Sequence, residues 1–296
     1  MARDPVIPAN KNNPANQSRR VAAAMKRVDA VIAETQAWLL LQLEQMPKRV
    51  TNSALANAQY EYLVDLAQLQ DIVAQIAARM QAAAPDVRGA ATGAYAEGSA
   101  QASINLAGLT ADYTRTVTGL LSSEPYMRRA SLVAARVFEE MQGFAGETGA
   151  DLARVLFTGI EEGKNPLEVA RLIRERFDVS RTRAERIART EINGALRRGR
   201  LDEEEDAQQR LGIKTGMLWL SALKPTTRPT HARRHGRVYT IQEIRDFYAK
   251  DGNSINCFCS FTSVLLNDDG APLSQGVIKR MTARREAYEA AQGGDA

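Results

Sequence analysis

The sequence has few of the residues on which small secreted proteins and β-rich proteins depend. Two cysteines and two histidines occur in 296 residues, and aromatic residues make up 6%. Two cysteines exclude a disulfide framework. The shortage of aromatic residues disfavours a sandwich or barrel, which usually carries more Val, Thr, Tyr and Phe. No apolar run approaches the roughly 18 residues that cross a bilayer, so no membrane partner is expected.

The first 20 residues lack the apolar stretch of a secretory signal peptide. We therefore expect the protein to stay in the cytoplasm in which it is made. Hydrophobic residues (44%) and charged residues (25%) are close to the globular average, which excludes wholesale disorder. The formal net charge of +4 favours acidic partners without identifying a nucleic acid.

Ala, Leu, Gln and Arg are abundant instead, and they predict a mainly helical protein. Residues 1–20 have prolines and asparagines but no hydrophobic period, which is typical of an extended arm that needs a partner surface to become ordered. After this arm, apolar residues recur at three- and four-residue steps and predict an amphipathic helix that ends at Pro47; they are Met25, Val28, Ile32 and Leu39.

The next two helices are bounded by caps, prolines and glycines. Asn52 or Ser53 is a plausible N-cap for a helix that ends before Pro85. Gly89, Gly93 and Gly98 then indicate either close helix packing or a loosely helical region. A third helix covers 126–144, and three glycines mark its end (Gly143, Gly146 and Gly149). A domain boundary near residue 145 follows from this pattern.

The second half of the chain changes from helical to β-like signals. Asn165 with Pro166 starts a helix after Gly163, and Ser180 caps another. The acidic run 202–206 is interpreted as a solvated helix end. Three short antiparallel strands are then predicted at 217–220, 237–240 and 259–265, with a helix at 241–250.

These elements predict a mainly α protein with a small α+β C-terminal module. Long helices form its N-terminal part, and a short antiparallel β-sheet lies in its C-terminal part. The predicted domains are an extended N-terminal arm (1–20), a helical region (21–145), a compact module (146–265), and a C-terminal helix and tail (266–296).

Three sets of residues are candidates for a site. Arg186, Arg189 and Glu191 lie on a helix whose inner face is otherwise small and apolar. They predict a structural clasp to a neighbouring loop, the alternative being a solvated ion pair. The second set holds five basic residues in a segment without an acidic residue: Lys224, Arg228, Arg233, Arg234 and Arg237. Such a set suits the binding of phosphates or of an acidic protein surface. The alternative is a solvated loop.

The third set contains both histidines and both cysteines of the chain, His231, His235, Cys257 and Cys259. Two sulfurs and two imidazole nitrogens would complete a tetrahedral structural zinc site. The other interpretation is packing, with hydrogen-bonded histidines and buried free thiols. No other cofactor is indicated.

The order of several motifs resembles the tailed-phage head morphogenesis proteins, the minor capsid proteins similar to the F protein of phage Mu and its counterpart in phage SPP1. The motifs are Arg-Ile-Ala-Arg-Thr-Glu at 186–191, Trp219, Thr-Arg-Pro-Thr-His at 227–231 with Gly236, and Asn-Cys-Phe-Cys at 256–259. The resemblance covers about 146–265. It implies a protein present in few copies in the virion head interior, assembled in the host cytoplasm. The implied partners are the portal protein, the major capsid or scaffolding protein, and DNA bound without sequence preference.

The chain departs from the family where a His-Pro pair usually precedes Cys-Arg-Cys, because it has Ser254, Ile255 and Asn256, and then Phe258. The zinc prediction therefore rests on the four residues themselves. The alternative function is a phage-encoded enzyme, either a zinc-dependent nuclease or an ADP-ribosyltransferase with its Glu-x-Glu at 203–205. We expect no enzyme, since no catalytic constellation accompanies these residues.

Overall fold

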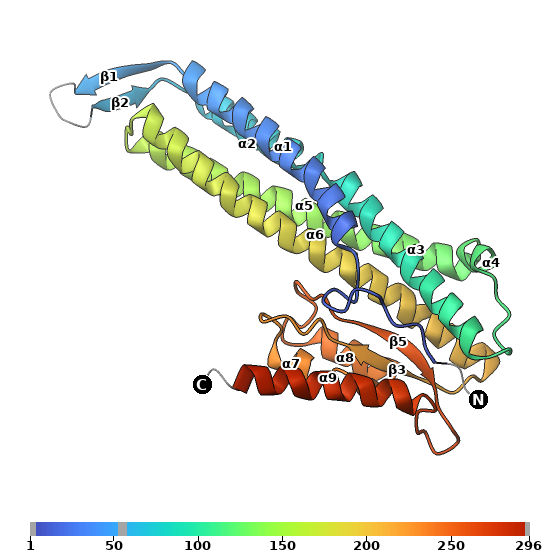
Figure 1. The fold of residues 1–296 in the computed structure, drawn as a ribbon. Coiled ribbons are helices and arrows are strands. Elements are labelled where there is room, and N and C mark those ends of the chain that lie inside the picture. Colours follow the sequence, from blue (N-terminus) through green and yellow to red (C-terminus); the bar gives the residue numbers. More distant parts are fainter. Residues whose placement is uncertain (1–3, 53–57, 294–296) are drawn as a thin grey trace. The chain divides into compact units, whose positions relative to one another are not determined.

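A computed structural model describes residues 4–52 and 58–293, which fold into long helices and a small sheet (Figure 1). The mainly α fold with a small antiparallel sheet in its C-terminal part is confirmed. The elements are α1 (Ser18–Gln45), β1 (Lys48–Asn52), β2 (Gln59–Tyr62), α2 (Leu66–Gln81), α3 (Ala84–Leu109), α4 (Val117–Leu121), α5 (Glu124–Glu161), α6 (Pro166–Leu211), β3 (Thr215–Leu220), α7 (Pro229–Ala232), β4 (Val238–Tyr239), α8 (Ile241–Ala249), β5 (Ser260–Leu265) and α9 (Gln275–Gly293). No helix in the described ranges has the length and apolarity that crossing a membrane requires.

The chain forms two compact units, and each combines segments that are distant in sequence. The sheet unit comprises Met1–Val21, Gly89–Ala134 and Arg189–Ala296, and the helical unit comprises Ala22–Arg88 and Ala135–Ala188. A division near residue 145 would fall inside α5, which continues through the glycines that were expected to end it. The predicted helix end at 143–149 is therefore wrong.

The helical unit is held together by apolar stripes. The residues predicted to face inward on the first helix, Met25, Val28, Ile32 and Leu39, are all buried. Ile72, Ile76 and Met80 form the buried stripe of α2. The predicted start of this helix is wrong, because Lys48–Asn52 and Gln59–Tyr62 pair as an antiparallel hairpin. Ser53 lies outside the described residues.

The start of α2 is set by a capping box further along the chain. The Asp65 carboxylate accepts the Gln68 backbone N–H at 2.8 Å, and the Gln68 side chain accepts the Asp65 N–H at 3.3 Å. Each side chain thereby satisfies an amide that the first turn of a helix leaves unpaired.

The long helix α6 begins where the sequence predicts but has no break at Ser180. Asn165 accepts the N–H of Leu167 at 2.9 Å, and Gly163, at φ 60°, ends the preceding segment. Ser180 does not cap a new helix: its hydroxyl donates to the carbonyl of Arg176 at 3.0 Å. A serine inside a helix can satisfy its hydroxyl in this way without ending the helix.

The sheet unit contains the three predicted antiparallel strands, and β3 lies between β4 and β5. On one face, Met217, Trp219 and Phe261 pack with α8 and with Leu201 of α6. On the other face, Leu218, Leu220 and Val264 pack against α9, which runs beside the sheet in Figure 1. Both faces of β3 are buried, and the strand ends in a continuous apolar run from Met217 to Leu220 instead of an alternating pattern.

The N-terminal arm does not need a second protein to become ordered. Within the sheet unit, the Val6 N–H donates to Asn105 at 2.7 Å, and the Ala15 N–H donates to the carbonyl of Phe258 at 3.2 Å. Asn13, Ala15 and Gln17 are buried. The expectation that the arm requires a partner surface is corrected, because the chain itself provides that surface.

The glycines of α3 include one site of close helix packing. A Cβ atom at Gly98 would lie 2.1 Å from the carbonyl oxygen of Leu196 on α6. At Gly93 it would meet only the end of the Arg20 side chain, and at Gly89 nothing lies within 4 Å. Of the two alternatives, close helix packing and a loosely helical region, close packing is therefore found at Gly98. Only a residue without a side chain permits the backbone contact there.

An alanine substitution should lower stability at a glycine in a close helix contact and raise it at a glycine on an exposed helix face. Gly98→Ala forces a Cβ into the Leu196 carbonyl and should destabilise the protein by about 3 kcal/mol. Gly143→Ala should stabilise it by about 0.5–1 kcal/mol, because Gly143 is an exposed residue inside α5 with nothing within 4 Å. Chemical denaturation measures both changes.

Gly89→Ala is the matched control, since Gly89 shares α3 with Gly98 but has open space around it. A loss of stability in Gly143→Ala would contradict the continuous helix α5. An unchanged stability in Gly98→Ala would contradict the close approach of α3 and α6.

Candidate functional site

A stripe of buried polar side chains runs along the C-terminal half of α6. Asn193, Arg197, Arg200 and Glu204 are separated by four, three and four residues, so they share one face of the helix. Each has at most 8% of its surface exposed. This stripe was not anticipated, although its helical spacing is visible in the sequence.

The stripe pairs in order with the segment that enters β5. Asn193 donates to the carbonyl of Cys257 at 2.9 Å, and Arg197 donates to the same carbonyl at 3.2 Å. Arg200 donates to the carbonyl of Phe261 at 2.7 Å. The hydroxyls of Ser263 and Thr215 donate to Glu204. These contacts fix the Cys-x-Cys segment on the helix.

The predicted clasp residues lie at the start of this contact region. Arg189 donates to the side-chain oxygen of Asn256 at 2.7 Å and lies over the Phe258 ring at 5.2 Å. Glu191 is buried and accepts from Arg198 at 3.4 Å. Arg186 is exposed on the same helix. Arg189 thus contacts the neighbouring loop, and Asn193 and Arg197, which the sequence analysis missed, add hydrogen bonds to the Cys-x-Cys segment.

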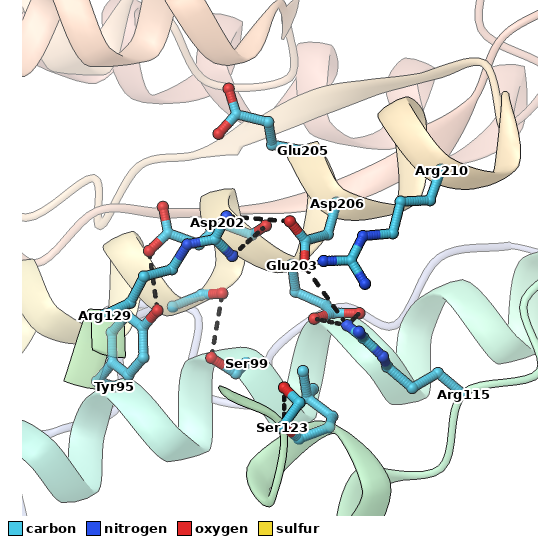
Figure 2. Close-up of polar contacts among 12 residues, drawn as sticks. Tyr95, Ser99, Arg115, Ser123, Arg129, Asp202, Glu203, Glu205, Asp206 and Arg210 are labelled. Carbon is cyan, nitrogen blue, oxygen red and sulfur yellow. Dashed lines mark hydrogen bonds and ion pairs between the residues drawn. The ribbon is translucent and has the colours of Figure 1, made fainter. Parts of the chain in front are cut away.

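The acidic run 202–206, which includes Glu204, is buried or half-buried, so its interpretation as a solvated helix end is wrong. Figure 2 shows three of its carboxylates directed toward side chains from α3 to α5. Asp202 accepts from the Tyr95 hydroxyl at 2.9 Å, Glu203 pairs with Arg115 at 3.1 Å, and Asp206 pairs with Arg129 at 3.0 Å. Burial raises the pKa of Asp202 and of Glu203. Their partners compensate part of the cost of burying these charges.

Another carboxylate of the run, Glu205, points away from this group in Figure 2 and pairs with Arg245 of α8 at 2.7 Å. The hydrogen bond from Arg245 lowers the pKa of Glu205. Glu203 and Glu205, which the transferase alternative would use as its Glu-x-Glu pair, therefore lie on a helix and hold neighbouring elements in place.

The basic segment divides into anchoring and exposed residues. Arg228 donates to the carbonyls of Gly252 and Ile255, and Arg234 stacks over the Phe247 ring at 3.9 Å. Lys224 lies over the Phe258 ring at 3.5 Å. Arg233 and Arg237 are exposed, and within the described residues their guanidinium groups make no hydrogen bond or ion pair. They line an open groove of about 790 Å³.

Three of the four predicted zinc ligands gather beneath this segment. His231, Cys257 and Cys259 are buried, and their ligand atoms lie within 4.8 Å of one another. The Nδ1 atom of His231 is 3.5 Å from the Cys257 sulfur and 3.7 Å from the Cys259 sulfur. A hydrogen bond between the two thiols lowers the pKa of Cys257 and raises the pKa of Cys259. Both cysteines are free thiols.

The structure does not bring His235 into this cluster. Its Nδ1 atom accepts the backbone N–H of Ser221 at 2.9 Å. Burial, with Arg284 and Arg285 nearby, lowers the pKa of His235 to about 4, so the ring is neutral at physiological pH. Because α7 ends at Ala232, His235 lies beyond the helix and does not share the helical face of His231.

Taken together, these features define a mainly helical fold with a small antiparallel sheet in its C-terminal part. Residues 150–262 match the family model described as Phage Mu protein F like protein. The resemblance to the tailed-phage head morphogenesis family is thereby confirmed for this segment.

A curated relative is the NAD(+)--arginine ADP-ribosyltransferase EFV of Enterococcus faecalis. It is 29% identical over 146 residues, which cover 46% of this chain and 30% of the relative. The chain therefore spans less than a third of that protein's length. No solved structure matches the chain.

The buried Glu204 carboxylate makes stability depend on pH. Burial raises its pKa from 4.5 to about 7, so the folded state binds the proton more tightly than the unfolded state. Stability should fall as pH rises from about 4.5 to about 7 and stay lower above it, by about 3 kcal/mol. Glu204→Gln removes this cost, and denaturation at pH 8 should show a gain of up to that size that vanishes near pH 4.5.

The matched control is Glu205→Gln on the same helical turn. The pKa of Glu205 is lowered by Arg245, so its carboxylate adds stability above its usual pKa and loses this contribution as pH falls. This variant should be less stable than the wild type at pH 8. Equal losses at pH 8 in both variants would refute the role of burial at Glu204.

Proposed function

We propose that this protein is a minor capsid protein of a tailed bacteriophage that acts in head assembly. The observation that carries the proposal is the match of residues 150–262 to the Phage Mu protein F like family. In this role the protein contacts the portal protein and the inner capsid, with the major capsid or scaffolding protein as neighbours, and it binds packaged DNA.

The exposed arginines supply the chemistry for the DNA contact. Arg233 and Arg237 form no ion pair with a described carboxylate, whereas Arg228 and Arg234 are occupied by carbonyls and aromatic rings. Free guanidinium groups on a fixed backbone bind phosphates without reading a base sequence. The same groove is also lined by Lys250, which adds a positive charge, and by Glu243, Asp246 and Asp251, which add negative charge.

Sedimentation tests the assembly role. The full chain should migrate with procapsids when it is co-expressed with the portal, scaffolding and major capsid proteins of its own phage, at fewer copies than the major capsid protein. Omitting the portal should reduce this recovery, because the portal is the proposed anchor. A chain that stays at the top of the gradient in both cases, or that consumes NAD⁺, would contradict the proposal.

DNA binding should depend on salt through the two exposed arginines. Each lost phosphate contact lowers the slope of log affinity against log salt by about 0.9, so Arg233→Gln with Arg237→Gln should lower it by about 1.8 on duplex DNA of any sequence. Fluorescence anisotropy at several salt concentrations measures the slopes.

The matched control is Arg154→Gln with Arg171→Gln. These residues are also exposed, and each is paired with a carboxylate on its own helix, so the variant has the same change in net charge. Its slope should equal that of the wild type. Equal slopes in all three proteins would remove DNA from the proposal and leave an acidic protein surface as the partner.

A further inference from the structure

The buried cluster of His231, Cys257 and Cys259 has the dimensions of a metal site. Zinc bound by sulfur at about 2.3 Å and by nitrogen at about 2.0–2.1 Å in a tetrahedron holds these atoms about 3.5 Å apart. The two distances from the His231 Nδ1 atom to the sulfurs are 3.5 and 3.7 Å. We propose that the protein binds one Zn²⁺ ion through His231 Nδ1 and the Cys257 and Cys259 thiolates.

Asn253 sets the histidine tautomer that such a site requires. The Asn253 amide nitrogen donates to the carbonyl of Phe247 at 3.0 Å, which turns its oxygen toward His231 Nε2, 3.3 Å away. This oxygen accepts a hydrogen bond, so the ring proton lies on Nε2. The Nδ1 lone pair then faces the two sulfurs. A second hydrogen bond of this kind, fixing ring orientation, is what metal-bound histidines usually have.

The loop that carries the cysteines is also shaped for sulfur ligation. Asn256 has a φ of 54°, so it supplies the left-handed turn for which glycine is otherwise used. Its N–H donates to Thr190 at 3.0 Å. The backbone N–H of Cys259 points at the Cys257 sulfur, 3.4 Å away, and an amide donor of this kind stabilises a thiolate.

Charge balance favours the ion inside this buried cluster. Two thiolates and a neutral imidazole cancel the charge of Zn²⁺, so the site adds no net charge to the interior. Zinc also satisfies three ligand atoms at once and joins α7 to the Cys-x-Cys segment. Hydrogen-bonded thiols would fill the same space, but they leave each sulfur with weak interactions only.

The site has three protein ligands, which leaves the fourth tetrahedral position for an exchangeable one. His231, Cys257 and Cys259 line a cavity of about 140 Å³ whose wall also includes Lys224 and Arg228. These cations favour water that has lost a proton or a small anion in that position. The inference concerns metal binding alone and is independent of the proposed role in head assembly.

The first experiment uses the full chain without a histidine tag. Protein made in zinc-containing medium and passed over a desalting column should contain about one zinc per chain by elemental analysis. Replacing zinc with Co²⁺ should give a thiolate-to-cobalt charge-transfer band and the intense visible bands of a tetrahedral site. Azide should shift the visible bands if the fourth position is exchangeable, and an unchanged spectrum would overturn that part of the proposal.

Variants identify the ligands. Cys257→Ser, Cys259→Ser and His231→Gln should lose the bound zinc, and Asn253→Ala should weaken zinc binding about 10- to 100-fold. His235→Gln is the matched control and should keep the wild-type zinc content, because His235 lies outside the cluster. Circular dichroism checks that each variant folds. Should the cysteine variants fail to fold, the cobalt spectrum of the wild type still reports sulfur ligation.

Two results would overturn the zinc site. One is a folded wild-type protein that contains no zinc and shows no heat of binding when zinc is titrated into it. The other is a folded His231→Gln variant that retains zinc with unchanged affinity. Equal loss in folded His231→Gln and His235→Gln would overturn the three-ligand set in favour of the four-residue site.

Discussion

The sheet unit depends on the buried polar side chains of α6, because they donate hydrogen bonds to backbone carbonyls that have no partner in the sheet. β5 pairs with β3 from Ser260 onward, so the carbonyls of Cys257 and Cys259 lie outside the sheet although both residues are buried. A buried carbonyl without a donor costs more than a typical hydrogen bond contributes. Asn193 and Arg197 supply these donors, and the position of the helix therefore fixes the position of both sulfurs.

Continuing the same helix, the acidic turn ties α6 to its neighbours by charge. Three carboxylates contact α3, α5 and the segment between α3 and α4: Asp202 accepts a hydrogen bond from Tyr95, Glu203 pairs with Arg115, and Asp206 pairs with Arg129. Glu205 forms an ion pair with Arg245 of α8. Replacing a buried charge network with apolar residues is often neutral for stability, but breaking one pair is costly. We infer that this network selects one register of α6 against α3, α5 and α8, because a shift of one residue would leave several buried charges unpaired. Gly98 then permits the backbone contact between α3 and α6.

The proposed metal site and the proposed partner surface share one short helix. His231 lies inside α7, and Arg233 is its C-terminal cap. An ion held between α7 and the Cys-x-Cys segment would restrict the same backbone that displays Arg233 and Arg237. Arg228 and Arg234 contribute to that restriction through carbonyls and aromatic rings. Basic residues that look alike in the sequence thus divide into those that build the surface and those that present charge on it.

The sequence by itself determined the helical class, the three strands and the inward face of the first helix, because these follow from local periodicity and turn residues. It also grouped His231, His235, Cys257 and Cys259 as one candidate set, of which three lie together in the structure. Only the tertiary structure decided that His235 is directed elsewhere, that Gly143 lies inside a helix and that the acidic run is buried. Helical spacing is the same for an exposed polar stripe and a buried one. Which of the two forms depends on the partners, and most of those lie 60 to 107 residues away along the chain.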